Sequence, residues 1–226
     1  MRRPADAGKA AAPVHHGLQS CLMERRPKIV FLPGASGAGE FWLPVSDRLP
    51  DGWQKTHLSW PGAGEEPHDP HVRSFEDLVA IACAELDDQS DLVAQSMGGI
   101  VAIGLALRYP QKVRRLVLVA TSGGIDMTSL GGADWREDYR AEYPHAAPWV
   151  SQETVDYGDA ITRLSAPTLL LWGDADPVSP VSIGKRLADL LPSSALHVLP
   201  GGTHSLAREH PDEVARLIIE HLQGVS

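Results

Sequence analysis

The stretch Leu92–Leu107 reads LVAQSMGGIVAIGLAL, and its character changes at Ser96. The apolar run before the serine is typical of a buried strand, and small and apolar residues at helical spacing follow it. Gly98 and Gly99 lie directly behind the serine, where a side chain would collide with the incoming strand. The stretch therefore predicts a strand that turns sharply into a helix, with the Ser96 hydroxyl at the corner.

The rest of the chain alternates short apolar runs with helical patterns. We expect strands over residues 27–34, 53–62, 91–95, 113–121, 166–173 and 195–201, and helices over 40–49, 74–86, 97–110, 182–192 and 212–223. Near-continuous apolar strands separated by helices are typical of a parallel sheet that is covered on both faces. The predicted fold class is α/β: a three-layer sandwich with a mostly parallel sheet of about six to seven strands.

Length and charge limit the possible partners. The 226 residues suit one globular domain, and the net charge of −9 disfavours nucleic acid and anionic membranes. No apolar run reaches the roughly 18 residues of a membrane span. Residues 1–20 lack the apolar core of a signal peptide and are expected to form a loosely ordered leader to a domain at 21–226. Two cysteines are too few for a disulfide framework, so we expect a cytoplasmic protein.

Residues 122–165 interrupt the alternation. They contain no strong strand pattern, and a structureless loop of this length is uncommon in a compact domain. We expect a small, partly helical cap above the sheet. The segment is acidic, with eight acids (Asp126, Asp134, Glu137, Asp138, Glu142, Glu153, Asp156, Asp159) against three bases (Arg136, Arg140, Arg163).

A serine at a helix start is most often a plain N-cap, so Ser96 alone indicates little. As a nucleophile it needs a base, and the base needs an orienting acid. Two later strands end in suitable residues: WGDADPVSP carries Asp174 and Asp176, and GGTHSLAREHP carries His204. Serine, acid and histidine therefore all follow strand ends, at the edge where open α/β sheets bind their ligands.

Five motifs together resemble the α/β-hydrolase fold superfamily over about residues 28–223. They are the serine corner AQSMGG, the acid turn WGDADPVSP, the histidine loop GGTHSLAREHPDEV, the early loop LPGASGAGEFW and the turn SWPGAGEEP. The resemblance implies a catalytic triad in the chain order of that family. Ser96 would be the nucleophile, His204 the base and Asp176 the acid, with Asp174 as the rival acid. The backbone N–H groups of Ala35 and Met97 would form the oxyanion hole.

The sequence departs from the family pattern at three places. Pro33 precedes Gly34 where the family usually has histidine, so the hydrogen bonds of that loop should differ. Ser59 and Trp60 stand where an aspartate often precedes the PGxG turn. Ala94 replaces the first glycine of the serine corner; we expect the corner to survive, with strained backbone angles at Ser96.

The resemblance implies a carboxylesterase-like serine hydrolase that cleaves a small, mostly neutral ester through an acyl-enzyme. Its partner would be a small-molecule ester, with no cofactor. The histidines show no metal-ligand spacing, so no metal is expected. Trp42, Trp60 and Trp149 are candidates to line the substrate pocket.

Other activities share the same residues. Thioester cleavage, carbon–carbon bond hydrolysis and perhydrolysis remain alternatives, although an acidic cap disfavours a coenzyme-A thioester or an acidic carrier protein. A ligand-binding or signalling protein without turnover is the alternative from another class. The sequence leaves the natural substrate and the oligomeric state open.

Overall fold

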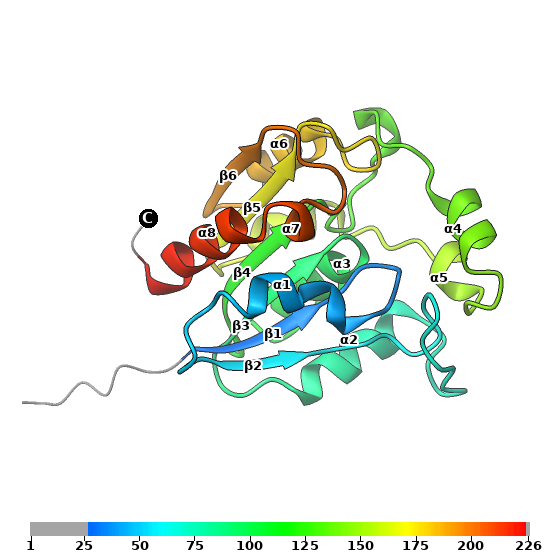
Figure 1. The fold of residues 1–226 in the computed structure, drawn as a ribbon, viewed down its shortest axis with the longest axis horizontal. Helices are drawn as coiled ribbons and strands as arrows, with labels where there is room; N and C mark the ends of the chain where they lie inside the picture. Colours follow the sequence, from blue (N-terminus) through cyan, green and yellow to red (C-terminus); the bar gives the residue numbers. More distant parts are fainter. Residues whose placement is uncertain (1–26, 225–226) are drawn as a thin grey trace, which may run out of the picture.

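A computed structural model describes residues 27–224 of the protein. The leader expected at residues 1–20 lies outside the described residues. Within them, six strands form one parallel sheet with the order β2-β1-β3-β4-β5-β6 (Figure 1). The predicted α/β class and parallel sheet are confirmed.

The elements alternate along the chain as the sequence predicts. The strands are β1 (Lys28–Leu32), β2 (Gln54–His57), β3 (Ser90–Gln95), β4 (Val113–Val119), β5 (Thr168–Gly173) and β6 (Ser194–Leu199). The helices are α1 (Leu43–Ser46), α2 (Phe75–Ala84), α3 (Met97–Arg108), α4 (Arg136–Glu142), α5 (Trp149–Gln152), α6 (Val181–Leu190), α7 (Leu206–Glu209) and α8 (Pro211–Gln223). Three 3-10 turns complete the set: η1 (Gly39–Trp42), η2 (Thr128–Leu130) and η3 (Gly158–Arg163).

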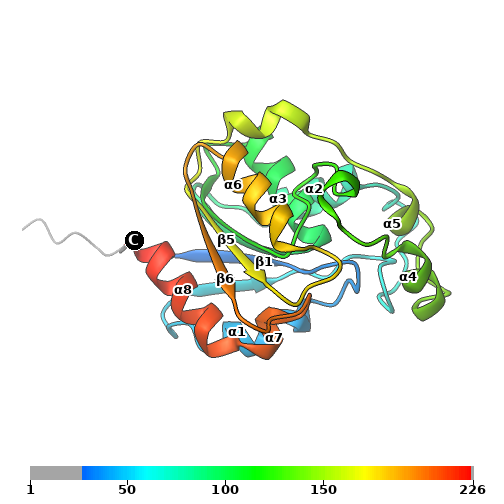
Figure 2. The same cartoon turned by 90° about the horizontal axis from the view of Figure 1, so that it is seen from above.

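The four central strands β1, β3, β4 and β5 supply side chains to two separate cores. In β4, Leu116 and Leu118 face one core, whereas Val117 and Val119 face the other. This follows from the two-residue period of a strand, which sends successive side chains to opposite faces. Helices α2, α3 and α6 cover the first face, and α1, α7 and α8 cover the second (Figure 2). Burial on both faces explains the apolar runs within these central strands.

The expected strand at 53–62 is wrong in its length. The structure pairs only Gln54–His57, and the chain leaves the sheet before Pro61. β2 is an edge strand with partly exposed residues, so burial supplies little to extend it. At Trp60 the chain instead bonds the loop after β1, with its N–H donated to the Gly37 carbonyl at 2.9 Å.

The strand order places a topological switch point between β1 and β3. The chain passes from β1 to β2 on one side and then returns to β3 on the other. At such a switch point the loops after the two neighbouring strands diverge and leave room for a ligand. The loop after β1 holds Ala35, and the turn after β3 holds Ser96, so the two loops expected to build the site follow neighbouring strands on either side of the switch point.

The segment between β4 and β5 leaves the sheet altogether. We call residues 122–165 the cap segment; it contains η2, α4, α5 and η3. Helices α4 and α5 lie together, well away from β6 at the far side of the sheet (Figure 1). No helix within residues 27–224 is long and apolar enough to cross a bilayer.

Candidate active site

Ser96 occupies a strained corner between β3 and α3. Its backbone angles are φ +50° and ψ −120°, outside the regions that non-glycine residues prefer. A Cβ at position 98 would lie 2.5 Å from the carbonyl oxygens of Leu32 and Pro33, so only glycine fits there. The chain is anchored before the turn, because the Ser96 N–H donates to the Val119 carbonyl at 3.0 Å. The serine corner survives the alanine at position 94.

The structure brings Ser96, His204 and Asp176 into one hydrogen-bonded line. Ser96 Oγ lies 3.0 Å from His204 Nε2, and His204 Nδ1 lies 2.8 Å from Asp176 Oδ2. A carboxylate accepts and cannot donate, so Nδ1 carries the proton and Nε2 is left to accept from the serine hydroxyl. The carboxylate is fully buried, whereas the imidazole is about a quarter exposed. This is the geometry of an assisted nucleophile.

The two candidate acids have different environments. Asp176 Oδ1 accepts from the N–H groups of Val178 and Ser179, at 2.8 and 3.0 Å, which leaves Oδ2 to face the histidine. Asp174 is exposed, and its Oδ1 accepts from Gly201 N–H at 2.6 Å. Asp174 therefore ties two loops together, and it is Asp176 that contacts His204.

The histidine loop is held against the turn after β5 and against the serine corner. Gln95 Nε2 donates to the His204 carbonyl at 3.2 Å, and Ala175 N–H donates to the Gly202 carbonyl at 3.0 Å. A Cβ at Gly173 would lie 2.0 Å from that same carbonyl. The close approach of two backbones thus explains the glycines of both motifs.

Two backbone N–H groups are available near Ser96 Oγ. Among the described residues, no group accepts a hydrogen bond from the N–H of Ala35 or of Met97. The peptide that carries the Ala35 N–H is fixed from its other end, because the Gly34 carbonyl accepts from Gly37 N–H at 3.1 Å. The peptide that carries the Met97 N–H is fixed in the same way, since the Ser96 carbonyl accepts from Gly99 N–H at 2.9 Å. Fixed, unpartnered donors are what an oxyanion hole requires.

The loop that carries Pro33 in place of histidine has its own supports. The Trp60 indole donates to the Pro33 carbonyl at 2.8 Å, and the Tyr139 hydroxyl donates to the Ala35 carbonyl at 2.9 Å. The Tyr139 oxygen also accepts from Gly64 N–H at 2.8 Å. Burial raises the pKa of Tyr139 above its ordinary value, so the phenol stays protonated and able to donate at neutral pH.

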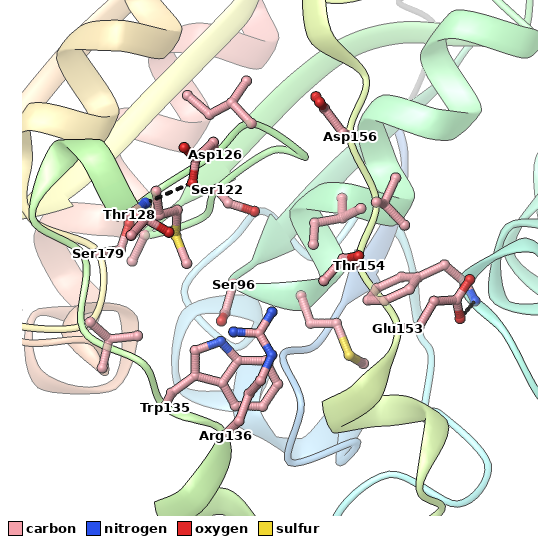
Figure 3. Close-up of a pocket in the computed structure, with 18 of the residues that line it drawn as sticks. Ser96, Ser122, Asp126, Thr128, Trp135, Arg136, Glu153, Thr154, Asp156 and Ser179 are labelled. Carbon is pink, nitrogen blue, oxygen red and sulfur yellow. Dashed lines mark hydrogen bonds between the residues drawn. The ribbon is translucent and has the colours of Figure 1, made fainter.

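A cavity of about 290 Å³ opens beside Ser96 and His204. Its apolar lining comes from the starts of α2 and α3, from the cap segment and from the acid turn: Phe75, Met97, Ile100, Ile125, Met127, Trp135, Val155 and Val178. Three carboxylates and one guanidinium also line it. Trp135 and Arg136 lie toward the Ser96 hydroxyl, and Asp126 and Asp156 lie at the other side of the cavity (Figure 3).

The expectation that Trp42 and Trp60 line the pocket is wrong. Both side chains are fully buried in the core, and neither is among the residues that line the cavity. Their indole N–H groups donate to the Leu32 and Pro33 carbonyls, which explains how two tryptophans are buried without an unpaired donor. Trp149 does not line the cavity either; it packs edge-on against Phe75, which does.

Sequence reasoning missed Phe75 as a lining residue. It directly follows Ser74, the N-cap of α2, whose oxygen accepts from Asp77 N–H at 3.3 Å. The only available signal was an aromatic residue at the start of a helix near the sheet edge.

The structure also bears on metal binding. Within residues 27–224, no group of three or more His, Cys, Asp or Glu side chains is placed to hold a metal ion.

A sequence profile of the alpha/beta hydrolase fold family matches residues 27–153, more than half of the chain. The chain belongs to this family. The match includes Ser96 and both candidate oxyanion donors, whereas Asp176 and His204 follow it in the sequence. The expected α/β-hydrolase fold is confirmed.

The curated relatives of this alpha/beta hydrolase are enzymes. It is 26% identical, over 87% of this chain and 93% of the other, to a pimeloyl-[acyl-carrier protein] methyl ester esterase of Neisseria meningitidis serogroup B. It is 24% identical, over 84% of each chain, to a 2-hydroxy-6-oxononadienedioate/2-hydroxy-6-oxononatrienedioate hydrolase of Burkholderia vietnamiensis. The structure of a thermophilic esterase from Thermogutta terrifontis shares the fold, with a TM-score of 0.72 and 22% identity over 88% of this chain and 90% of that one. These relatives support an esterase-type hydrolase.

Proposed function

We propose that the protein is a serine carboxylesterase that cleaves a small, mostly neutral ester through an acyl-enzyme. The observation that carries this proposal is the continuous line from Ser96 Oγ through His204 to the buried Asp176. Two unpartnered backbone N–H groups next to the nucleophile support it, since acyl transfer develops negative charge on the carbonyl oxygen.

Acylation follows from the protonation pattern of the triad. Ser96 Oγ attacks the ester carbonyl carbon while His204 Nε2 takes the hydroxyl proton. The carbonyl oxygen becomes an oxyanion that accepts hydrogen bonds from the N–H groups of Ala35 and Met97. Asp176 stabilises the imidazolium that has formed. When the C–O bond to the alcohol breaks, Nε2 returns the proton to the departing alkoxide, and Ser96 is left acylated.

Deacylation repeats these steps with water. A water molecule loses a proton to His204 Nε2 as its oxygen attacks the acyl carbon, and the same two N–H groups hold the second oxyanion. The bond to Ser96 Oγ then breaks, and Nε2 gives the proton to the serine. The carboxylic acid product leaves, and the enzyme returns to its starting protonation state.

The cavity favours a small, neutral substrate. Asp126, Glu153 and Asp156 line it together with the single guanidinium of Arg136, so its wall is acidic. Arg136 is also paired with Asp134, with Nη1 at 3.1 Å from Oδ1. A volume of about 290 Å³ suits a short acyl or alcohol group.

The same charges weigh against two alternatives. The Burkholderia relative is named for dienedioates, which carry two carboxylates that an acidic wall would repel. The Neisseria relative is named for an ester on an acyl carrier protein, and the acidic cap segment disfavours an acidic carrier. Ester hydrolysis is common to that relative and to the present proposal.

Covalent labelling tests the proposal directly. A fluorophosphonate probe should label the folded wild-type protein at Ser96, and labelling should disappear in Ser96→Ala and fall strongly in His204→Ala. Both variants should lose p-nitrophenyl acetate turnover, by roughly 10⁴-fold or more given the effect of removing triad members. An unlabelled Ser96 in folded protein would favour the non-catalytic, ligand-binding alternative.

A further inference from the structure

Thr121 lies directly after β4 and contacts the serine corner from behind. It is 1% exposed and does not line the cavity, so substrate in the cavity does not reach its side chain. Its hydroxyl donates to the Ser96 carbonyl at 2.6 Å and accepts from Gly123 N–H at 2.9 Å. The proposed mechanism gives this buried hydroxyl no role.

The carbonyl that Thr121 bonds belongs to the same peptide as the Met97 N–H. In a trans peptide the C=O and N–H point in opposite directions, so a donor on the Ser96 oxygen fixes the direction of the Met97 N–H. Hydrogen bonds in a chain also polarise one another, which makes the far N–H a stronger donor. The series of hydrogen bonds here runs from the Gly123 N–H through the Thr121 hydroxyl and the Ser96–Met97 peptide to the oxyanion.

Two features independent of this hydrogen bond fix the threonine in place. A Cβ at Gly99 would lie 2.4 Å from Thr121 Oγ1 and 2.6 Å from its Cβ, so the first turn of α3 has no side chain where Thr121 packs. Ala120, one residue before it, has φ +47°, a conformation that costs a non-glycine residue about 1 kcal/mol or more. The strained turn at the end of β4 directs the chain so that Thr121 contacts the serine corner.

We propose that Thr121 is a positioning residue of the oxyanion hole: its hydroxyl orients and polarises the Met97 N–H through the Ser96 carbonyl. This inference rests on the proposed esterase function and deepens it. Because Thr121 acts through a peptide group, it should affect the transition state and leave ground-state binding of the substrate unchanged.

The test compares Thr121→Val, which keeps the shape but removes the hydroxyl, with Thr121→Ser, which keeps the hydroxyl. Thr168→Val is the matched control, because Thr168 is buried and donates to the Ala166 carbonyl at 3.0 Å, at the opposite end of β5 from the site. For each variant we would measure kcat and KM for p-nitrophenyl acetate, the inhibition constant of a trifluoromethyl ketone, the pH profile of kcat/KM, and Tm.

Outright loss of an oxyanion donor costs about 10²–10³-fold in kcat, so an indirect loss should cost about tenfold. We expect Thr121→Val to lower kcat about tenfold with KM unchanged, and to weaken binding of the tetrahedral ketone adduct in proportion. Thr121→Ser should recover most of kcat, and the pH profile should keep its position. Thr168→Val should lower Tm without lowering kcat.

Three results would overturn the inference. The first is a Thr121→Val enzyme with wild-type kcat. The second is an equal loss of kcat in Thr121→Val and Thr121→Ser. The third is a fall in kcat for Thr168→Val that is as large, for the same fall in Tm, as that of Thr121→Val. Failure of the proposed function is separate, because it would appear as a wild-type protein with neither probe labelling nor ester turnover.

Discussion

At the scale of single residues, the site depends on where glycine is required and where it is not. Gly98 is required because the carbonyl oxygens of Leu32 and Pro33 lie 2.5 Å from any added Cβ. Ala94, two residues before Ser96, takes the place of a family glycine and is fully buried in the core beside β1. The corner therefore tolerates a methyl group on the strand side and none on the helix side.

Gly98→Ala should consequently be the most damaging single methyl in the corner. The added Cβ must displace either the end of β1 or the start of α3, and both carry a candidate oxyanion donor nearby. We expect loss of fluorophosphonate labelling together with a destabilisation of about 1–3 kcal/mol, as is usual for overpacking. Labelling and denaturant unfolding would be measured beside Gly52→Ala, where an added Cβ has nothing within 4 Å. A Gly98→Ala enzyme that is labelled and fully active would contradict this account of the serine corner.

The two aspartates of the acid turn give a second prediction at this scale. Asp176→Asn should reduce kcat by about 10⁴-fold, because an amide facing Nδ1 favours the wrong tautomer of His204. Asp174→Asn keeps an oxygen that can accept from Gly201 N–H, so we expect less than a tenfold change. Steady-state kinetics on p-nitrophenyl acetate would compare the two, and a larger loss for position 174 would reassign the acid.

The grouping of Ser96, His204 and Asp176 could be predicted from the sequence because each of them follows the end of an apolar strand in a parallel sheet. Strand ends are visible in sequence, and topology then gathers them at one edge. We call residues 33–37, which carry the candidate donor Ala35, the oxyanion loop, and the supports of this loop could not be predicted. Tyr139 reaches Ala35 from 104 residues away, and no local pattern relates the two. Trp42 and Trp60 were misplaced because an aromatic residue after a strand can face the core or the cavity, and sequence does not distinguish the two.

At the scale of elements, the cap segment does more than cover the cavity. Helix α4 contributes Arg136 to the cavity wall, and one turn later it contributes Tyr139 to the oxyanion loop. Trp135, the residue directly before α4, packs edge-on against Tyr139 with ring centroids 5.4 Å apart. A cavity-lining residue and a support of the oxyanion loop therefore lie on one short helix, so a displacement of α4 would change both.

Tyr139→Phe tests this coupling. It removes the donor to the Ala35 carbonyl and the acceptor for Gly64 N–H while keeping the ring. We expect a severalfold fall in kcat and a loss of about 1–3 kcal/mol in stability from the unpaired groups. Tyr143→Phe, at the end of the same helix, is the control, since its hydroxyl has no bond to the oxyanion loop. Equal kinetics for the two variants would show that the cap does not support the loop.

At the scale of the whole molecule, α8 packs on the core that contains Val117 and Val119, and it carries a buried histidine. His221 is 6% exposed, and its Nε2 has no hydrogen-bond partner among the described residues. Burial, assisted by the nearby charge of Arg115, lowers the pKa of His221 to about 4 from its ordinary 6.5. The folded protein therefore holds this side chain neutral at pH values where the unfolded chain protonates it.

This difference makes stability depend on pH in a defined direction. Between pH 6.5 and about 4 the unfolded state binds the proton and the folded state does not, so the free energy of unfolding falls as pH falls. At about 1.36 kcal/mol per pKa unit, the loss from this one group is roughly 3 kcal/mol between pH 7 and pH 4. His221→Leu removes the titrating group, so the fall in the free energy of unfolding between pH 7 and pH 4 should be smaller by that amount.

Denaturant unfolding at a series of pH values would measure the effect, with His197→Gln as the control because His197 is exposed on the edge strand β6. The control should follow the wild-type curve, whereas His221→Leu should diverge from both only below pH 6.5. Parallel curves for all three proteins would show that the fall in stability at acidic pH belongs to other groups. Since α8 packs against β5, the strand that precedes the acid turn, we expect ester turnover to disappear irreversibly over the same acidic pH range, at a higher pH in the wild type than in His221→Leu.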